Sequence, residues 1–406
     1  MTLLKSALAI LLAAPVFGSD GATPAQQGLR VHEWGTFTSV AGESGGPQAW
    51  APLSGPSDLP CFVYHLGNRC IKCVLPSTPP STPPTVTTST VRMETPVLYF
   101  YAPRRMTLSV SVDFPQGWIT EWYPQASNVT PEIPPGTQAR LPGPGGAPGG
   151  GHIEWNQVVV SPGSPATGPI GAGASHYYAA RNTDSHPIAV SGQSEKLIFY
   201  RGIANFPVPL WARVLDDTRI ELRNTGDRAL PLTILFENRG GKIGYRATRE
   251  LSGALQIEMP ELTAGLDRLK LDLANALVDM GLYRKEALAM IETWRDSWFE
   301  EGMRVFYLMP RRNVDAVLPL AVNPAPAATE RVFVGRVEIL SPYVRQSLRS
   351  ALSSGDTATL AQYGRFLEPF AQRIPGGATA NPATSAFFQA RYDEARRQFD
   401  SPSCVR

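Results

Sequence analysis

The hydrophobic pattern of this chain changes its period after Pro260, and this change constrains the fold more than any other feature. Leu108, Val110, Val112 and Phe114 alternate with polar residues, as in a strand with one face on a core and the other in water. After Pro260, leucines recur every three or four residues, which is the period of one helix face. The sequence therefore predicts a β-rich region followed by a helix-rich one.

Short strands bounded by turn residues dominate the β-rich region. The predicted strands there span residues 29–40, 107–114, 118–123, 197–206, 219–223 and 230–237. Only 18% of residues are charged, while Gly and Pro number 36 and 38, a composition that favours many ordered loops. Strands of this length and spacing predict a β-sandwich, Ig-like or of a related type.

We expect three segments along the chain. Residues 1–18 are a predicted signal peptide, 19–258 a β-rich sandwich domain, and 259–406 a helix-rich part packed on the β core. Two further predicted strands, 303–309 and 331–340, rejoin the sheet from within the last segment. The predicted fold class is α+β, with mainly β structure.

The first residues have the organisation of a secretory signal. A short basic start, Met1–Lys5, precedes an apolar run, Ser6–Phe17, and a small-residue cleavage site before Ser19. We therefore expect a periplasmic or secreted protein. No later segment has the length and apolarity of a membrane span, so no stable membrane anchor is expected. The net charge of +2 gives no reason to expect a nucleic-acid partner.

Four cysteines fit an oxidising compartment. The candidates for disulfide bonds are Cys61, Cys70, Cys73 and Cys404. Because Cys70 and Cys73 would close a very small ring, we favour Cys61 paired with one of them, and the sequence leaves the pairing open. Structural zinc bound by the first three cysteines and His65 is the less favoured alternative in that compartment.

Three Glu-Trp pairs suggest glycan chemistry. They are Glu33-Trp34, Glu121-Trp122 and Glu154-Trp155, with His152 two residues before the last pair. Sugars stack on aromatic rings, and glycoside hydrolysis needs two carboxyl groups. The candidate catalytic residues are Glu33, Glu154 and His152, and the candidate substrate-binding residues are Trp34, Trp122, Trp155 and Glu121. The alternative is an ordinary strand, with Trp in the core and Glu in water.

Histidines suggest a second kind of site, a divalent transition metal such as zinc, iron or copper. The candidate ligands are His32, His152, His176 and His186, together with Glu154. Their spacing matches no compact metal motif, so they would have to converge through folding. The alternative for each histidine is a hydrogen-bonded loop or core residue.

Residues 42–46 (GESGG) fit the spacing of a nucleophile elbow after a strand. Proline residues 47 and 52 follow it instead of a helix, so we interpret the segment as a turn. Ser44 is therefore not predicted to be a nucleophile.

Three sequence motifs carry a resemblance to other proteins. HEWGTFTSV, RMETPVLYFY and WRDSWFEEGMRVFYLMPR resemble those of a group of exported bacterial proteins with no assigned activity. The resemblance covers most of the mature chain and brings no catalytic residues with it. It implies that the cysteine segment and the Pro-rich stretch are additions to a shared core.

Together these features predict an exported protein that recognises an extracellular polymer such as a glycan. If the protein is an enzyme, we expect it to hydrolyse that polymer. The alternatives are a non-catalytic envelope or binding protein with a polymer or small-molecule ligand, and a metal-dependent enzyme with His and Glu ligands. The sequence leaves open whether the protein is an enzyme. If it is one, we expect a hydrolase, either glycosidase-like or metal-dependent.

Overall fold

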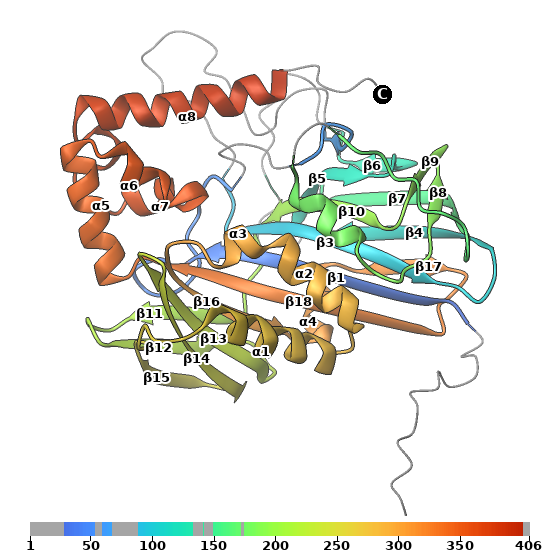
Figure 1. Ribbon diagram of the computed structural model, residues 1–406, viewed down its shortest axis with the longest axis horizontal. Helices are drawn as coiled ribbons and strands as arrows, with labels where there is room; N and C mark the ends of the chain where they lie inside the picture. The colour runs from blue at the N-terminus through green and yellow to red at the C-terminus, as the bar shows by residue number, and fades with distance from the viewer. Residues whose placement is uncertain are drawn as a thin grey trace, which may run out of the picture.

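A nine-stranded sheet forms the centre of the molecule, with β1 (Arg30–Val40) in its middle (Figure 1). The computed structural model describes residues 28–52, 59–66, 88–132, 141, 149–171 and 174–400. The predicted signal peptide lies outside these residues. The β1 segment is rich in β-branched and aromatic residues, which favour extended backbone, and all but its first residue are buried.

The nine strands come from both the start and the end of the chain. Their order is β14 (Lys242–Leu251), β13 (Leu230–Arg239), β16 (Gly302–Met309), β18 (Ala328–Ile339), β1, β3 (Val91–Tyr101), β10 (Ile198–Ala204), β5 (Gly117–Tyr123) and β2 (Tyr64–His65). β1 pairs in parallel with β18 and antiparallel with β3. Strands nearly 300 residues apart therefore build the middle of one sheet.

Two smaller sheets accompany the large one. The six-stranded sheet contains β17 (Leu320–Asn323), β4 (Met106–Phe114), β7 (Gly151–Val160), β8 (Ile188–Val190) and β9 (Gln193–Glu195), with β6 (Asn128–Thr130) paired to β7. The three-stranded sheet contains β11 (Leu210–Val214), β12 (Arg219–Asn224) and β15 (Ala254–Glu258). Their inner faces share one apolar core with the nine-stranded sheet.

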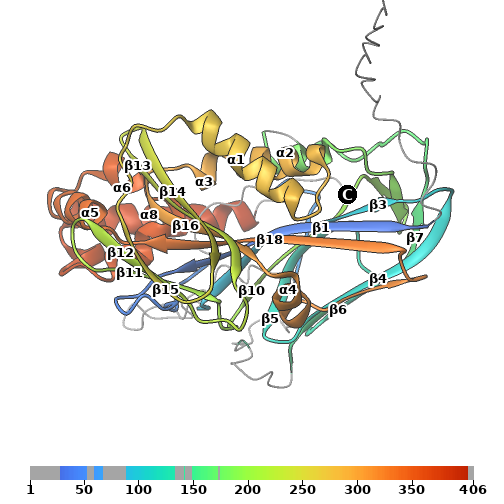
Figure 2. The same cartoon turned by 90° about the horizontal axis from the view of Figure 1, so that it is seen from below.

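Helices cover the opposite face of the large sheet. These are α1 (Leu266–Asp279), α2 (Arg284–Thr293), α3 (Arg295–Trp298) and the short η1 (His176–Arg181). Figure 2 shows α1, α2 and α3 on one side of the β1–β18 layer and β4, β6 and α4 (Arg311–Val317) on the other. The large sheet is therefore buried on both faces.

The C-terminal helices pack at one end of the sheet (Figures 1 and 2). They are α5 (Pro342–Ser354), α6 (Thr357–Ala361), η2 (Gly364–Phe366), α7 (Leu367–Ala371), η3 (Gly377–Thr379) and α8 (Pro382–Asp400). The Ser341 hydroxyl caps α5 and the Asp356 carboxylate caps α6. A separate apolar cluster, which includes Trp50 and Phe366, joins these helices to the loop after β1.

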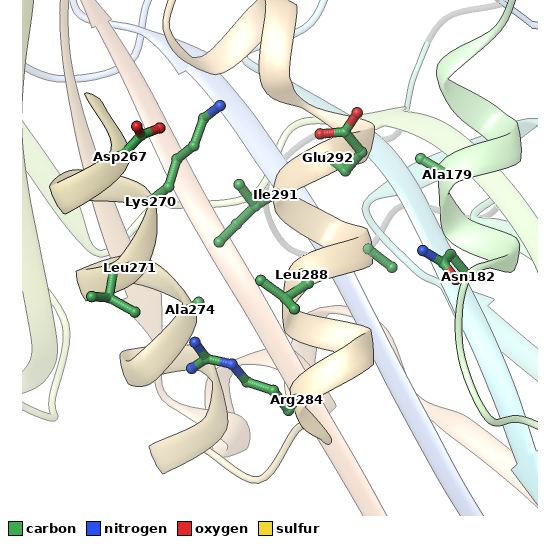
Figure 3. Close-up of a pocket in the computed structure, with 11 residues that line it drawn as sticks. Ala179, Asn182, Asp267, Lys270, Leu271, Ala274, Arg284, Leu288, Ile291 and Glu292 are labelled. Carbon is green, nitrogen blue, oxygen red and sulfur yellow. The ribbon is translucent and has the colours of Figure 1, made fainter. Parts of the chain in front are cut away.

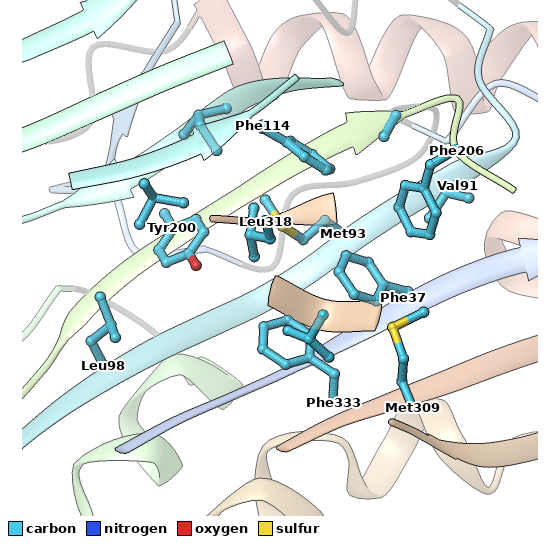
Figure 4. Packing of buried hydrophobic residues seen from close by; sticks show 14 of the residues in the cluster. Phe37, Val91, Met93, Leu98, Phe114, Tyr200, Phe206, Met309, Leu318 and Phe333 are labelled. Atoms are coloured by element: carbon cyan, nitrogen blue, oxygen red, sulfur yellow. The ribbon is translucent and has the colours of Figure 1, made fainter. Parts of the chain in front are cut away.

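Aromatic and aliphatic side chains fill the core between the sheets. Figure 4 shows Phe37 among its neighbours, at 5.0 Å between ring centroids from both Phe206 and Phe333. The core under the helices instead contains Trp34, Phe306 and Leu273. Adjacent β1 residues thus belong to different cores, because neighbouring side chains of a strand point to opposite faces.

The mainly β, α+β fold with helices concentrated toward the C-terminus is confirmed. The Ig-like sandwich is not confirmed: such a sandwich packs two antiparallel sheets, whereas here the largest sheet contains a parallel pair and has helices on one face. Strands β16 and β18, which follow residue 258, join the large sheet, in agreement with the predicted strands at 303–309 and 331–340. Among the described helices, none is long and apolar enough to cross a membrane.

Candidate functional site

Glu33 is sealed between the sheets. Its side chain is fully buried, contacts Arg331 Nε at 2.5 Å and accepts a hydrogen bond from the Tyr200 hydroxyl. Arg331 continues the network to Asp315 at 2.8 Å. This carboxylate is held by a guanidinium and a phenol inside the protein, and its position suits a structural ion pair.

The other predicted members of the glycan site lie in different layers. Trp34 faces the helices, on the opposite side of the sheet from Glu33, and lies 6.4 Å from the Tyr99 ring. Glu121 is also buried, while its neighbour Trp122 points to the other face and stacks on Tyr64 at 6.3 Å. Alternation along each strand therefore separates the carboxylate from the indole in both pairs.

The third pair divides in the same way on β7. Trp155 is fully buried, lies 6.3 Å from the Tyr200 ring and donates its indole N–H to the Pro124 carbonyl. His152 and Glu154 point to the outer face of the six-stranded sheet, where His152 Nδ1 lies 2.7 Å from Asp113 Oδ1. Trp155 and Glu33 thus both adjoin Tyr200, but Glu33, His152 and Glu154 do not form one site.

The remaining candidate metal ligands are each engaged elsewhere. His32 is buried with Nδ1 2.8 Å from Glu286 Oε2, and His176 Nε2 lies 2.9 Å from Asp296 Oδ2. His186 Nδ1 accepts the backbone N–H of Ala102 at 2.9 Å. In the part of the chain that the structure describes, no three His, Cys, Asp or Glu side chains gather as a metal site would require. The four histidines do not converge.

The cysteine prediction stays open. Cys61 lies in a turn just before β2. Cys70, Cys73 and Cys404 lie outside the described residues, so the disulfide pairing remains a prediction.

A row of buried charged side chains crosses the helix-facing side of the large sheet, and we call it the charge row. It consists of Arg304, Arg336, Glu338, Arg92, Glu94, Arg201 and Glu121, all at most 6% exposed. Members of the row lie on neighbouring strands. Arg304 is the cross-strand partner of Glu338, and Arg201 is that of Glu121. Arg336 and Arg92 are the two cross-strand partners of Thr38. Fully buried charges persist in proteins only when they are paired.

The charge row connects the sheet to the helices that cover it. Glu338 Oε1 lies 2.8 Å from Arg304 Nε and 2.5 Å from Arg336 Nε. Arg336 also donates to Ser297 of α3, and its guanidinium lies 4.7 Å from the Phe366 ring centroid. Arg304 donates to the backbone carbonyls that follow α3. The charge row therefore links the large sheet to α3 and to the segment that follows α3 through buried ion pairs and hydrogen bonds.

Burial and ion pairing oppose each other at Glu94 in this row. Burial by itself would raise the pKa of the Glu94 carboxyl, but the guanidiniums of Arg365 and Arg92 together hold that pKa below its usual value. Arg365 comes from η2, so this carboxylate also binds the C-terminal helices to the sheet. Glu94 is therefore charged in the folded protein at neutral pH.

A small polar hollow lies on the outer face of the three-stranded sheet, and we call it the Trp211 hollow. Its volume is about 150 Å³ and its lining residues are Ser44, Trp211, Arg213, Glu221 and Arg223. Trp211 is directly opposite Arg223, and Arg213 is directly opposite Glu221 in the β11–β12 register. Alternation places all four of these strand residues on one face, and Trp211 is 38% exposed.

The turn predicted at residues 42–46 packs against Trp211 and β11 beside the hollow. Gly42 N–H donates to the Gly46 carbonyl at 2.7 Å, and Ala212 N–H of β11 donates to Gly45 at 3.0 Å. Gly46 lies so close to Trp211 that a Cβ there would be 3.1 Å from the indole ring. The backbone of this turn therefore fixes the position of the ring.

Sequence reasoning did not select Trp211. The signal was present in LWARV, where Leu210, Ala212 and Val214 alternate with Trp211 and Arg213. In a strand with one buried face, this pattern places the tryptophan on the charged, outward face. The Glu-Trp pairs were predicted as the sugar site instead. Adjacent residues of a strand point to opposite faces, so the two members of such a pair cannot line one site on a strand.

A larger groove of about 440 Å³ lies between α1, α2 and η1 (Figure 3). Its walls are mainly aliphatic, with Leu271 and Leu288 42% and 48% exposed. Asp267, Lys270, Arg284 and Glu292 also line it, so its formal charges cancel. The groove has no aromatic lining residue on which a sugar ring would stack.

Comparison with known proteins does not assign the chain to a family. No protein-family model matches the chain, and no curated protein is significantly similar to it.

Proposed function

We propose that the protein is an exported, non-catalytic binding protein that recognises an extracellular polymer such as a glycan at the Trp211 hollow. One observation carries the proposal. All eight tryptophans lie in the described part of the chain, and Trp211 is 38% exposed whereas each of the others is at most 9% exposed. A stacking platform for a sugar must be reachable from water, and this indole meets that condition.

The neighbours of Trp211 also suit a sugar. The indole supplies an apolar surface for the C–H face of a pyranose ring, while Arg213, Arg223 and Ser44 supply hydrogen-bond donors for hydroxyl groups. The volume of the hollow, about 150 Å³, is small, and the Trp211 ring is exposed beside it. An exposed, open platform of this kind fits a polymer that passes across the surface.

The hollow has little provision for hydrolysis. Glycoside hydrolysis uses two carboxyl groups about 5–10 Å apart on either side of the bond. Glu221 is the only carboxylate among the residues that line the hollow, and it lies 3.0 Å from one guanidinium and 3.6 Å from another. We therefore favour recognition without cleavage. The proposed periplasmic or secreted location follows from the predicted signal peptide, and it would place the hollow where such polymers occur.

Affinity electrophoresis through gels containing a panel of extracellular polysaccharides tests this function. The wild-type protein is expected to be retarded by at least one polymer. Trp211→Ala should weaken that binding by at least about tenfold, because it removes the platform. Leu288→Ala is the control, since it truncates an exposed apolar side chain in the other groove and should bind as wild type does.

Two results would contradict the proposal. One is a panel in which no polymer retards the wild-type protein. The other is a Trp211→Ala protein that binds with unchanged affinity. Circular dichroism of both variants confirms that they are folded.

A further inference from the structure

Two arginines flank the exposed indole of the Trp211 hollow. Arg223 lies directly across the strand pair from Trp211, and Arg213 follows two residues later on the same face of β11. Cross-strand neighbours in an antiparallel pair have their Cβ atoms about 5 Å apart. Both guanidiniums can therefore reach a group that projects from a ring stacked on Trp211.

A single carboxylate holds these two guanidiniums. Glu221 Oε1 lies 3.0 Å from Arg223 Nη2, and Glu221 Oε2 lies 3.6 Å from Arg213 Nη2. The Glu221 side chain is only 13% exposed, whereas those of Arg213 and Arg223 are 46% and 54% exposed. The carboxylate thus lies beneath the two cations, which face the solvent.

The formal charge of the hollow is consequently positive. Two guanidiniums and one carboxylate leave +1 among the lining residues, with the positive groups outermost. Each guanidinium carries five N–H donors in a planar fork that matches the oxygens of a carboxylate or sulfate. Such charge-assisted hydrogen bonds are about twice as strong as neutral ones.

The binding surface is also largely preorganised. The β11–β12 ladder fixes the spacing of the two arginines, and the Gly46 backbone positions the indole. The Arg223 guanidinium donates a hydrogen bond to Glu221, which also forms a longer ion pair with Arg213. Ordering a long side chain on binding costs conformational entropy. Partial ordering before the ligand arrives reduces this cost.

We infer that the Trp211 hollow selects a sugar that carries an anionic group, with the ring stacked on Trp211 and the anion between Arg213 and Arg223. The anion is a uronate carboxylate or a sulfate ester, because each carries at least two charged oxygens on one atom, which a guanidinium fork can bind with two parallel hydrogen bonds. This inference rests on the proposed glycan-binding function and specifies its ligand class.

Calorimetric titration with three matched oligosaccharides tests the selectivity. The ligands are tetragalacturonate, its carboxyl-reduced neutral form, and a galactose oligomer of the same length bearing sulfate esters. Wild-type protein should bind an anionic oligomer at least about tenfold more tightly than the neutral one. The anionic oligomer that binds more tightly shows whether the hollow prefers a carboxylate or a sulfate ester. Raising the salt concentration should weaken anionic binding and leave neutral binding nearly unchanged.

The arginine variants separate charge recognition from stacking. Arg213→Gln and Arg223→Gln should each weaken binding of the preferred anionic oligomer by about fivefold or more. Binding of the neutral oligomer should weaken clearly less, because the amide still donates hydrogen bonds to hydroxyl groups but carries no charge. Trp211→Ala should weaken binding of all the oligomers that wild type binds. Leu288→Ala should change none of these affinities.

The outcomes distinguish the two claims. If the neutral oligomer binds as tightly as the anionic ones, or if the arginine variants lose both classes equally, the anionic selectivity is wrong. Glycan recognition would still stand in that case, provided that Trp211→Ala loses the neutral binding. If no oligomer and no polymer of the earlier panel binds, the proposed function fails as well.

Discussion

The charge row and the Trp211 hollow are both built from arginine and glutamate on neighbouring strands, yet they differ in burial. In the row, Arg304, Arg336 and Glu338 are at most 1% exposed, and the charges bind one another and the helices above them. In the hollow, Glu221 also lies between two arginines, but their guanidiniums face the solvent. Burial therefore decides whether such ion pairs hold layers of the fold together or lie open to water, where we propose that they bind a ligand.

The sharpest test of this comparison exchanges one carboxylate for an amide in each region. Glu338→Gln leaves two buried guanidiniums without their shared anion and should lower the free energy of unfolding by about 3–5 kcal/mol. Glu221→Gln, the matched change between solvent-exposed arginines, should lower it by less than about 1 kcal/mol. Urea denaturation of both variants measures the difference. Equal losses would show that burial does not separate the two regions.

Acid sensitivity provides a second test. Because the folded protein lowers the pKa of Glu94, this group stabilises the fold above the ordinary carboxyl pKa of about 4.3, and the stabilisation is lost as the pH falls through the lowered value. The stability gap between wild type and Glu94→Gln should therefore be constant near neutral pH and narrow as the pH falls below about 4.3. Urea denaturation across that range measures it, with an effect smaller than that of Glu338→Gln.

Glu43 is the matched control for acid sensitivity. The Arg345 and Arg373 side chains lower its pKa by hydrogen bonding, but the Glu43 side chain is 70% exposed. Solvent screens such pairs, so Glu43→Gln should show a small stability gap at every pH. A gap for Glu43→Gln that rivals that of Glu94→Gln would contradict the role assigned to burial.

A third test changes the shape of the hollow without changing its charge. The Cβ of Gly46→Ala would lie 3.1–3.3 Å from three carbons of the Trp211 ring, so the ring must shift. We expect about threefold weaker glycan binding and a stability change within about 0.5 kcal/mol. Gly253→Ala, whose Cβ meets nothing within 4 Å, is the control. Unchanged binding by Gly46→Ala would mean that the turn does not position the ring.

The smallest expected effect concerns the arginine fork. Arg223→Lys keeps the positive charge but replaces the planar fork by a point charge, so binding of anionic oligosaccharides should weaken by about two- to threefold. Calorimetric titration measures this change, and neutral oligosaccharides should bind as before. A loss as large as that of Arg223→Gln would indicate that geometry, not charge, dominates recognition.

Local periodicity predicted much of the secondary structure. The alternation at residues 107–114 corresponds to β4, the apolar run at 230–237 corresponds to β13, and the leucine spacing after Pro260 corresponds to α1. The pairing of β1 with β18 could not be predicted in the same way, because their residues are nearly 300 positions apart. No local pattern records which strands become neighbours across such a distance.

The candidate site shows the same limit. Alternation indicates that Glu33 and Trp34 face opposite ways, and that Trp211 and Arg213 face the same way. Whether a face is open or covered depends on what packs against it. Both faces of the nine-stranded sheet are covered, which buries Glu33 and Trp34, whereas the outer face of the three-stranded sheet leaves Trp211 exposed.

The sequence by itself determined which segments are strands or helices and which side chains of a strand share a face, because both follow from the periods of the backbone. The tertiary structure alone decided which of those faces meet water. The free energy of a buried or exposed charge depends on layers supplied by distant parts of the chain. That is why similar arginine–glutamate sets became a sealed joint in one sheet and an accessible hollow in another.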